Sequence, residues 1–138
     1  MTDRFVVKRR VLFGDCDPGG ILYTPRAAHY IVEAGLDFFR ARLGDGAERK
    51  LFEQGIAPPA RAFSIEFMKP MTWDDVIEIE EQVKEIRTHA IVLRFFGTVS
   101  GFDVLSAEIT QVIVSTNTMQ PTPVTDELRA NLLGNANG

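Results

Sequence analysis

Residues 24–44 read TPRAAHYIVEAGLDFFRARLG, and this stretch predicts one long helix against which the rest of the chain must pack. Its apolar residues recur at helical spacing, at Ala27, Ile31, Ala34 and Phe38. Thr24 as the N-cap residue and Pro25 as the first helical residue are typical of a helix start, and Gly44 suits the helix end. Because the apolar stripe is wide, we expect the helix to be covered on most of its sides.

The segments on both sides of this helix are rich in β-branched and apolar residues. They predict five strands, over residues 5–13, 61–69, 75–87, 89–100 and 103–115. A short helix is expected over 47–55, another near 125–133, and a hairpin turn over 100–103. Four strands joined by short links favour an antiparallel meander, so the predicted fold class is α+β, with the long helix across one face of the sheet.

Two features of the predicted strands bear on packing. Within 75–87 the apolar and polar residues alternate, but Glu81 falls at an apolar position. Several phenylalanines are expected in the core, namely Phe38, Phe39, Phe63, Phe67, Phe95 and Phe96. Since one helix cannot cover five long strands completely, we expect a partner subunit to bury the remaining apolar face or edge.

Composition and charge limit the classes of function. The 138 residues suit one domain, expected over 1–138 with a partly frayed tail at 117–138. A net charge of −4 argues against nucleic acid as the main partner. The single cysteine fits a reducing compartment, and no apolar run approaches the ~20 residues that a membrane helix needs. The first residues do not resemble a signal peptide, so we expect a cytoplasmic protein without a membrane segment.

The loop before the long helix, FGDCDPGGILYTP over residues 13–25, is the candidate functional segment. Calcium-binding EF-hand loops begin with the same D-x-D pattern. Here the third acidic position of that pattern holds Gly19 and the closing glutamate position holds Arg26, so we expect no metal site. Cys16 as a nucleophile would need an imidazole, and the chain has only His29 and His89. A capped turn with solvated aspartates is the remaining structural interpretation.

A catalytic interpretation follows from the helix start. The first amides of a helix are unpaired and carry the positive end of the helix dipole, so they can stabilise the oxyanion of a tetrahedral intermediate. A carboxylate on the same loop can attack a carbonyl or activate a water against it. Gly19 and Gly20 would let a substrate approach the backbone closely. This combination predicts acyl transfer from an activated ester or thioester.

The loop and the segment FMKPMTWDDVIEIE, residues 67–80, resemble the hotdog-fold acyl-CoA thioesterases of the 4-hydroxybenzoyl-CoA thioesterase family. The family pattern D-x-D-x-x-G-h-h-Y, where h is apolar, matches at Asp15, Asp17, Gly20, Ile21, Leu22 and Tyr23. The resemblance covers roughly residues 5–115 and implies a hotdog fold, in which a five-stranded antiparallel sheet wraps a long central helix. It also implies homo-oligomers, either dimers or tetramers, with active sites between subunits.

The resemblance also assigns roles to single residues. Asp17 falls on the family's catalytic carboxylate, which acts as nucleophile or general base, and the Thr24 amide on the oxyanion donor. Asp15 is expected to support the loop. Gly20 and Tyr23 belong to the same substrate-binding motif.

Residues outside this motif complete the predicted substrate site. Arg87, Thr88 and His89 lie where family members bind the coenzyme phosphates. Lys69 is a further candidate for the phosphates, and Ser64 for the acyl pocket, although each also suits a solvated surface.

The sequence therefore predicts an acyl-CoA thioesterase that hydrolyses a small acyl group, with 4-hydroxybenzoyl-like aromatic groups included. We expect no metal or redox cofactor, and coenzyme A would enter as part of the substrate. The alternatives are a hotdog hydratase or dehydratase acting on an acyl thioester, and a non-catalytic acyl-CoA binding protein. The first alternative needs a histidine paired with a carboxylate, and neither His29 nor His89 lies in a recognisable pairing.

Overall fold

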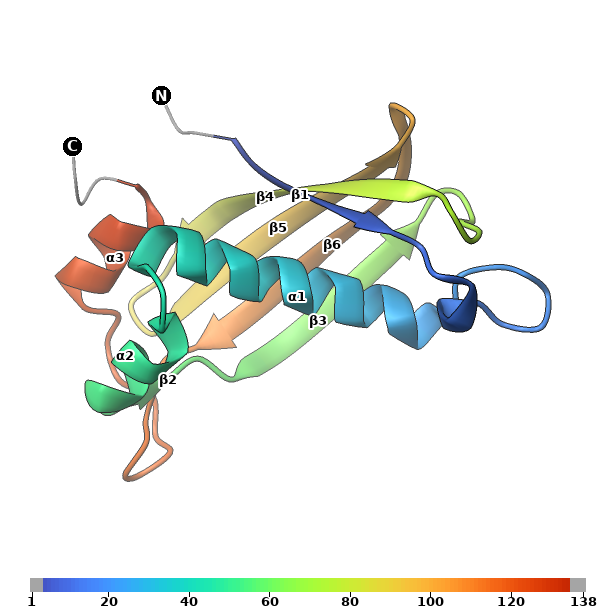
Figure 1. Ribbon diagram of the computed structural model, residues 1–138. Coiled ribbons are helices and arrows are strands. Elements are labelled where there is room, and N and C mark those ends of the chain that lie inside the picture. Colours follow the sequence, from blue (N-terminus) through green and yellow to red (C-terminus); the bar gives the residue numbers. More distant parts are fainter. Residues whose placement is uncertain (1–3, 135–138) are drawn as a thin grey trace.

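The computed structural model describes residues 4–134, and its regular elements follow the predicted order (Figure 1). The helices are α1 (Thr24–Leu43), α2 (Ala47–Glu53) and α3 (Asp126–Leu132), with a single 3-10 turn at Phe13–Asp15. The strands are β1 (Phe5–Arg10), β2 (Ile56–Ala57), β3 (Ala60–Phe67), β4 (Val76–Ile86), β5 (Ala90–Val99), β6 (Phe102–Val112) and β7 (Val114–Ser115). Of the tail predicted to fray, residues 135–138 lie outside the described part.

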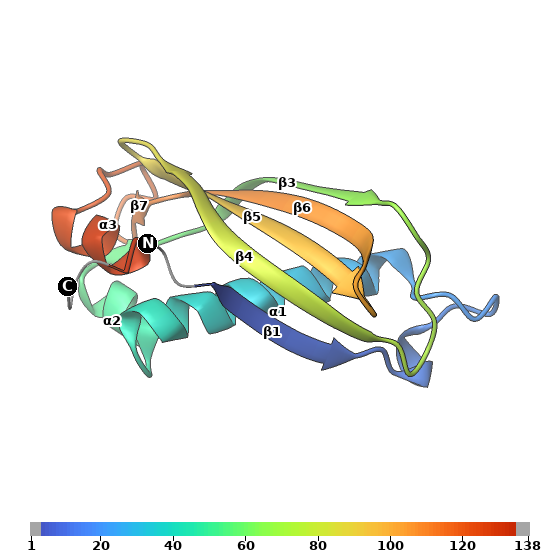
Figure 2. The ribbon, with the colours of Figure 1, turned by 90° about the horizontal axis from the view of Figure 1, so that it is seen from above.

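The five long strands form one antiparallel sheet in the order β1-β4-β5-β6-β3. The predicted meander is correct for β4, β5 and β6 but wrong for β3, which pairs with β6 at the far edge instead of with β4. The link over residues 68–75 contains Pro70 and passes around the end of the sheet, so it does not form a hairpin (Figure 2). The first strand ends at Arg10, because the chain turns at Phe13–Asp15.

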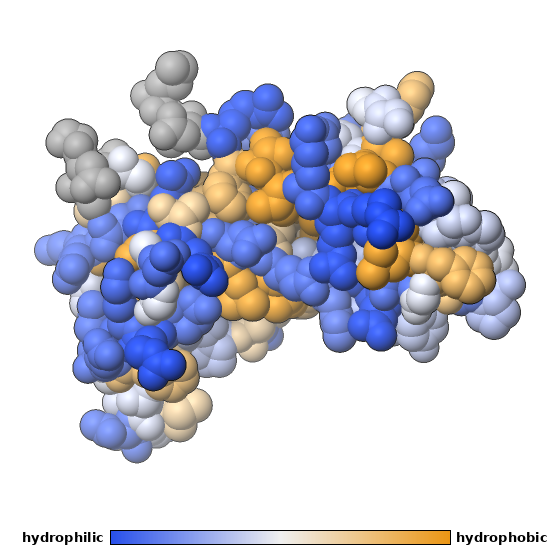
Figure 3. All heavy atoms as spheres, viewed as in Figure 1, coloured by the Kyte–Doolittle hydropathy of each residue, from blue (hydrophilic) through white to orange (hydrophobic). Residues whose placement is uncertain are grey.

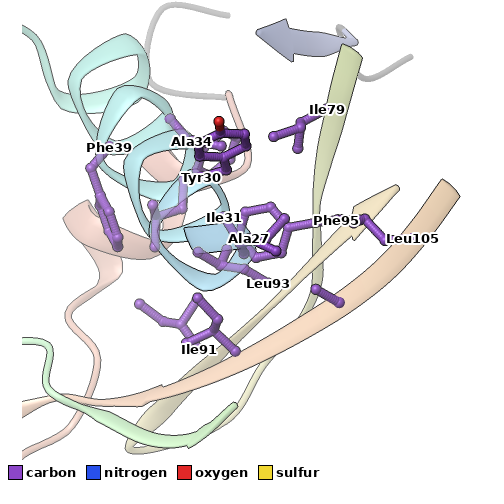
Figure 4. Close-up of a cluster of buried hydrophobic side chains, with 14 of the residues drawn as sticks. Ala27, Tyr30, Ile31, Ala34, Phe39, Ile79, Ile91, Leu93, Phe95 and Leu105 are labelled. Carbon is purple, nitrogen blue, oxygen red and sulfur yellow. The ribbon is translucent and has the colours of Figure 1, made fainter. Parts of the chain in front are cut away.

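Helix α1 lies across the concave face of the curved sheet, so this face holds the core (Figure 1, Figure 2). The predicted stripe of Ala27, Ile31, Ala34 and Phe38 is buried. It packs toward inward-facing residues of the central strands, namely Ile79, Ile91, Leu93 and Phe95 (Figure 4). Three phenylalanines predicted in the core are instead exposed at 36–44%, because Phe63 and Phe67 lie on the edge strand and Phe96 faces away from α1.

The ends of the elements carry the expected local signals. The β5–β6 turn is confined to Ser100 and Gly101, which both have positive φ, as a two-residue hairpin requires. Thr125 caps α3, since its Oγ1 accepts a hydrogen bond from the Leu128 amide at 3.1 Å. Apolar side chains remain visible on both sides of α1 at the surface (Figure 3). None of the described helices is long and apolar enough to cross a membrane.

Candidate active site

The loop before α1 closes on itself through Asp17. The Asp17 amide donates to the Ile21 carbonyl at 2.8 Å, and the Gly20 amide donates to the Asp17 carbonyl at 2.9 Å. Asp17 Oδ1 accepts hydrogen bonds from the amides of Gly19 and Ile21, at 2.9 and 3.3 Å. Its Oδ2 accepts none from the described residues, and the side chain is half-buried. One carboxylate oxygen thus orders the loop while the other stays available for chemistry.

Gly20 anchors this loop to the link between β3 and β4. Its φ is +82°, and a Cβ there would lie 3.1 Å from Trp73, so a side chain would meet both backbone strain and a tight contact. The Gly20 carbonyl accepts a hydrogen bond from Thr72 Oγ1 at 2.7 Å, and the Leu22 amide donates to the Met71 carbonyl at 2.8 Å. These bonds fix the loop against residues 71–73.

Asp15 holds the base of the loop to the core. Its carbonyl accepts the Tyr23 amide at 2.9 Å, and the Tyr30 hydroxyl donates to its Oδ2 at 2.6 Å. The guanidinium nitrogens of Arg9 and Arg26 approach its carboxylate at 3.7 and 3.6 Å. Burial and the Asp15 acceptor raise the pKa of Tyr30, which keeps the hydroxyl protonated as a donor. Asp15 is therefore fully engaged in support of the loop, as predicted.

The start of α1 presents a free backbone donor. Tyr23, not Thr24 as predicted, is the N-cap residue, since its backbone is extended and its carbonyl accepts the Arg26 amide at 2.8 Å. Thr24 is then the first helical residue, and Pro25 after it has no N–H. Within the described chain the Thr24 amide donates to no acceptor. The positive end of the α1 dipole is thus concentrated on one exposed N–H.

A cleft of about 290 Å³ opens beside Thr24. It is mostly apolar and is lined by Ile21, Leu22, Thr24, Phe67, Met68, Lys69, Pro70 and Met71. Lys69 brings a cation to it, with its Nζ 4.6 Å from the centre of the Phe102 ring. The fold therefore joins the helix start, the loop that carries Asp17 and Gly20, and Lys69 in one region.

Sequence reasoning missed four residues of this cleft, Phe67, Met68, Pro70 and Met71. Phe67 was expected in the core, and Met68 was given no role. Both are exposed, by 44% and 50%, and both line the cleft. Their position directly before Lys69, at the end of a strand, was the available signal.

The other predicted residues lie elsewhere in the chain. Ser64 faces a shallow hollow on the side of the sheet away from α1, shared with Arg94 and Glu108. Arg87, Thr88 and His89 form the β4–β5 turn beside α3, at the opposite end of the sheet from Thr24 (Figure 1). One chain by itself does not bring these four residues to Asp17.

Neither rival interpretation of the loop gains support from the contacts. Cys16 is half-buried, and its Sγ lies 3.6 Å from the Leu12 carbonyl. The structure gives no hydrogen bond between it and His29 or His89, both of which are exposed. In residues 4–134 no three His, Cys, Asp or Glu side chains gather in a group that could hold a metal ion.

Comparison with known proteins identifies the family to which this chain belongs. The family model described as the thioesterase-like superfamily matches residues 11–132. The chain belongs to this superfamily. Two thioesterases are similar to this chain in sequence. The 4-hydroxybenzoyl-CoA thioesterase of Pseudomonas sp. strain CBS-3 is 30% identical over 95 residues, which are 68% of this chain and 67% of that protein. The acyl-CoA thioesterase YbgC of Haemophilus influenzae is 28% identical over 83 residues, 60% of each chain.

A solved structure has the same fold. It is the D17N mutant of 4-hydroxybenzoyl-CoA thioesterase in complex with 4-hydroxybenzoyl-CoA. The TM-score is 0.86 at 22% identity, over 94% of this chain and 98% of that one. The predicted hotdog fold and the resemblance to the 4-hydroxybenzoyl-CoA thioesterase family are confirmed.

Proposed function

We propose that this protein hydrolyses the thioester bond of a small acyl-CoA, with aromatic acyl groups of the 4-hydroxybenzoyl type included. The free Thr24 amide at the start of α1, beside a mostly apolar cleft and the Asp17 loop, is the observation that carries the proposal. Membership in the thioesterase-like superfamily and the two similar thioesterases support the reaction class. The acyl group, by contrast, is inferred from those relatives and from the apolar lining of the cleft.

In this mechanism the thioester carbonyl oxygen accepts a hydrogen bond from the Thr24 amide, which stabilises the negative charge that develops there. Asp17 Oδ2 then attacks the carbonyl carbon and expels the coenzyme A thiolate, leaving an anhydride that water hydrolyses. Alternatively, Oδ2 removes a proton from a water that attacks directly. Both routes give the free acid and coenzyme A without a metal or redox cofactor.

The active site would draw on more than one copy of the chain. Edge strand β3 is almost wholly exposed, and only Ile65 on it is half-buried, so the strand is free to pair with a second copy. Arg87, Thr88 and His89 lie at the opposite end of the sheet from Thr24 within one chain, so in this proposal the β4–β5 turn that holds the coenzyme phosphates comes from another copy. We also propose that the protein is located in the cytoplasm.

The deciding experiment measures thiol release from benzoyl-CoA, 4-hydroxybenzoyl-CoA, acetyl-CoA and palmitoyl-CoA. We expect turnover by the wild type, with the Asp17→Asn variant reduced by about 10³-fold because it lacks the nucleophile or base. Asp103→Asn, which changes an exposed aspartate on β6, is the matched control and should keep full activity.

Full activity of Asp17→Asn would overturn the mechanism. Hydration of an enoyl-CoA without thiol release would favour the hydratase alternative. Binding of an acyl-CoA without turnover of any of the four substrates would favour the non-catalytic one.

A further inference from the structure

A second cavity lies at the other end of α1 from Thr24, where the helix meets β4 and α3. Its volume is about 220 Å³. Apolar side chains form much of its wall, among them Phe38, Val83 and Leu132, and its polar side chains include Arg42 and Glu81. The proposed thioesterase reaction uses none of these residues.

Glu81 is the unusual member of this lining. It occupies an inward position on β4, between the buried Ile79 and the half-buried Val83, and is only 3% exposed. Neither of its carboxyl oxygens has a hydrogen-bond partner among the described residues. Buried polar groups are nearly always paired, so two orphaned oxygens on a cavity wall indicate that something else supplies the partner.

The surroundings of Glu81 favour its neutral form. Burial is the main reason that its pKa is raised from 4.5 to about 9, the Asp37 carboxylate on α1 adds to the rise, and Arg42 opposes it. At neutral pH the Glu81 carboxyl group therefore carries a proton that it can donate.

Arg42 is the second polar group without a partner. Its guanidinium carbon lies 5.0 Å from the centre of the Phe38 ring, and its Nε is buried without a hydrogen bond in the described chain. No described carboxylate lies within 4.0 Å of it, whereas Arg4 at the same cavity is neutralised by Glu80 at 2.6 Å. Glu81 and Arg42 thus face one space as two donors that do not bond to each other.

We infer that this cavity binds a small carboxylic acid with an apolar body, separate from the proposed active site. The carboxylate of such a ligand has two acceptor oxygens, one for the Glu81 hydroxyl and one for the Arg42 guanidinium. Its body would pack on Phe38, Val83 and Leu132. A cavity of 150 Å³ lined by apolar residues accepts benzene, so 220 Å³ has room for a single-ring acid.

The test is a titration of the full-length protein with 4-fluorobenzoate at pH 7, followed by methyl NMR. We expect saturable shifts of the Val83 and Leu132 methyl groups. The methyl groups of Ile21 serve as a separate probe of the cleft beside Thr24. Loss of one charge-assisted hydrogen bond should weaken binding by about tenfold or more in Glu81→Leu and in Arg42→Gln.

Two variants serve as matched controls. Glu81→Gln keeps a donor, so it should bind at pH 7, but it should lose the fall in affinity that the wild type shows as pH rises through about 9. Arg40→Gln, which changes an exposed arginine two residues away on α1 that is paired with Asp45, should bind like the wild type. Circular dichroism of each variant establishes that it is folded.

Several results would overturn the inference. One is shifts confined to Ile21, and another is unchanged affinity in folded Glu81→Leu. A third is tighter binding of benzylamine than of 4-fluorobenzoate, which would mean that Glu81 is ionised and receives a cation. Absence of saturation in the wild type would mean that the cavity holds only water.

Discussion

Asp15 and Glu81 are both buried carboxyl groups, but they differ in their hydrogen-bond and ion-pair partners and therefore in their effect on stability. Asp15 accepts the Tyr30 hydroxyl and lies near two guanidinium groups, so its burial is compensated by partners. Glu81 has no such partner among the described residues. A buried carboxyl without a partner lowers the free energy of unfolding, because ionisation is lost or penalised in the folded state.

The stability of the folded state should therefore depend on pH through Glu81. In the unfolded chain this group ionises near 4.5, and in the folded state near 9. Between these values the folded state binds more protons, so the free energy of unfolding should fall as pH rises, by up to about 1.4 kcal/mol per pH unit. Urea unfolding from pH 5 to 9 should show this slope in the wild type and not in Glu81→Gln.

An exposed glutamate supplies the comparison for this measurement. Glu66→Gln, on the opposite face of the sheet, should keep the wild-type slope. Equal slopes in the wild type and Glu81→Gln would mean that Glu81 ionises normally in the folded protein.

At the scale of the element, the start of α1 is the part to which the proposed function assigns the chemistry. Its free amide can be removed without breaking the helix, since proline is tolerated in the first helical turn. Tyr23 before it is already extended, as the residue before a proline should be. A proline at position 24 would therefore test the role of the backbone N–H of this residue.

Thr24→Pro should lower thiol release by about 10²–10³-fold, because it deletes the proposed oxyanion donor. Thr24→Ala keeps the amide and should stay within a few-fold of the wild type. Helix content by circular dichroism should be the same in both variants. Comparable activity of the proline and alanine variants would remove the Thr24 amide from the mechanism.

Local patterns were sufficient to predict α1 and the five long strands, because periodicity in the sequence reports directly on burial. Ala27, Ile31 and Ala34 are buried as the spacing indicated, and Glu81 already stood out against its strand. The position of β3 beside β6 was not predictable in this way, since strand order depends on contacts far apart in the sequence. The cleft that joins Thr24 with Lys69 depends on the same long-range arrangement.

At the scale of the whole molecule, strand β3 forms an exposed edge of the five-stranded sheet. Phe63 and Phe67 lie on the same face of this strand as Ile65 and remain exposed by 38% and 44%. An exposed edge with apolar side chains favours association with another chain. The proposed function also requires a second chain, because Thr24 and the basic β4–β5 turn lie at opposite ends of the sheet within one chain.

Phe63→Lys should shift the protein toward the monomer in sedimentation velocity, because a charge at this edge opposes the burial of β3. Phe52→Lys, at the 60% exposed Phe52 of α2, should sediment like the wild type. A wild type that is monomeric at the concentrations used for the activity assay would refute the proposed assembly, whichever way the variants behave.

Cys16 is the single thiol of the chain, and it directly precedes Asp17 in the loop before α1. A fluorophore or spin label attached through maleimide chemistry would therefore report from one known position, without removal of competing cysteines. Because the thiol is half-buried, its rate of labelling would report on the accessibility of this part of the loop. Protection of that thiol by a bound acyl-CoA analogue would give a substrate-occupancy signal that needs no turnover.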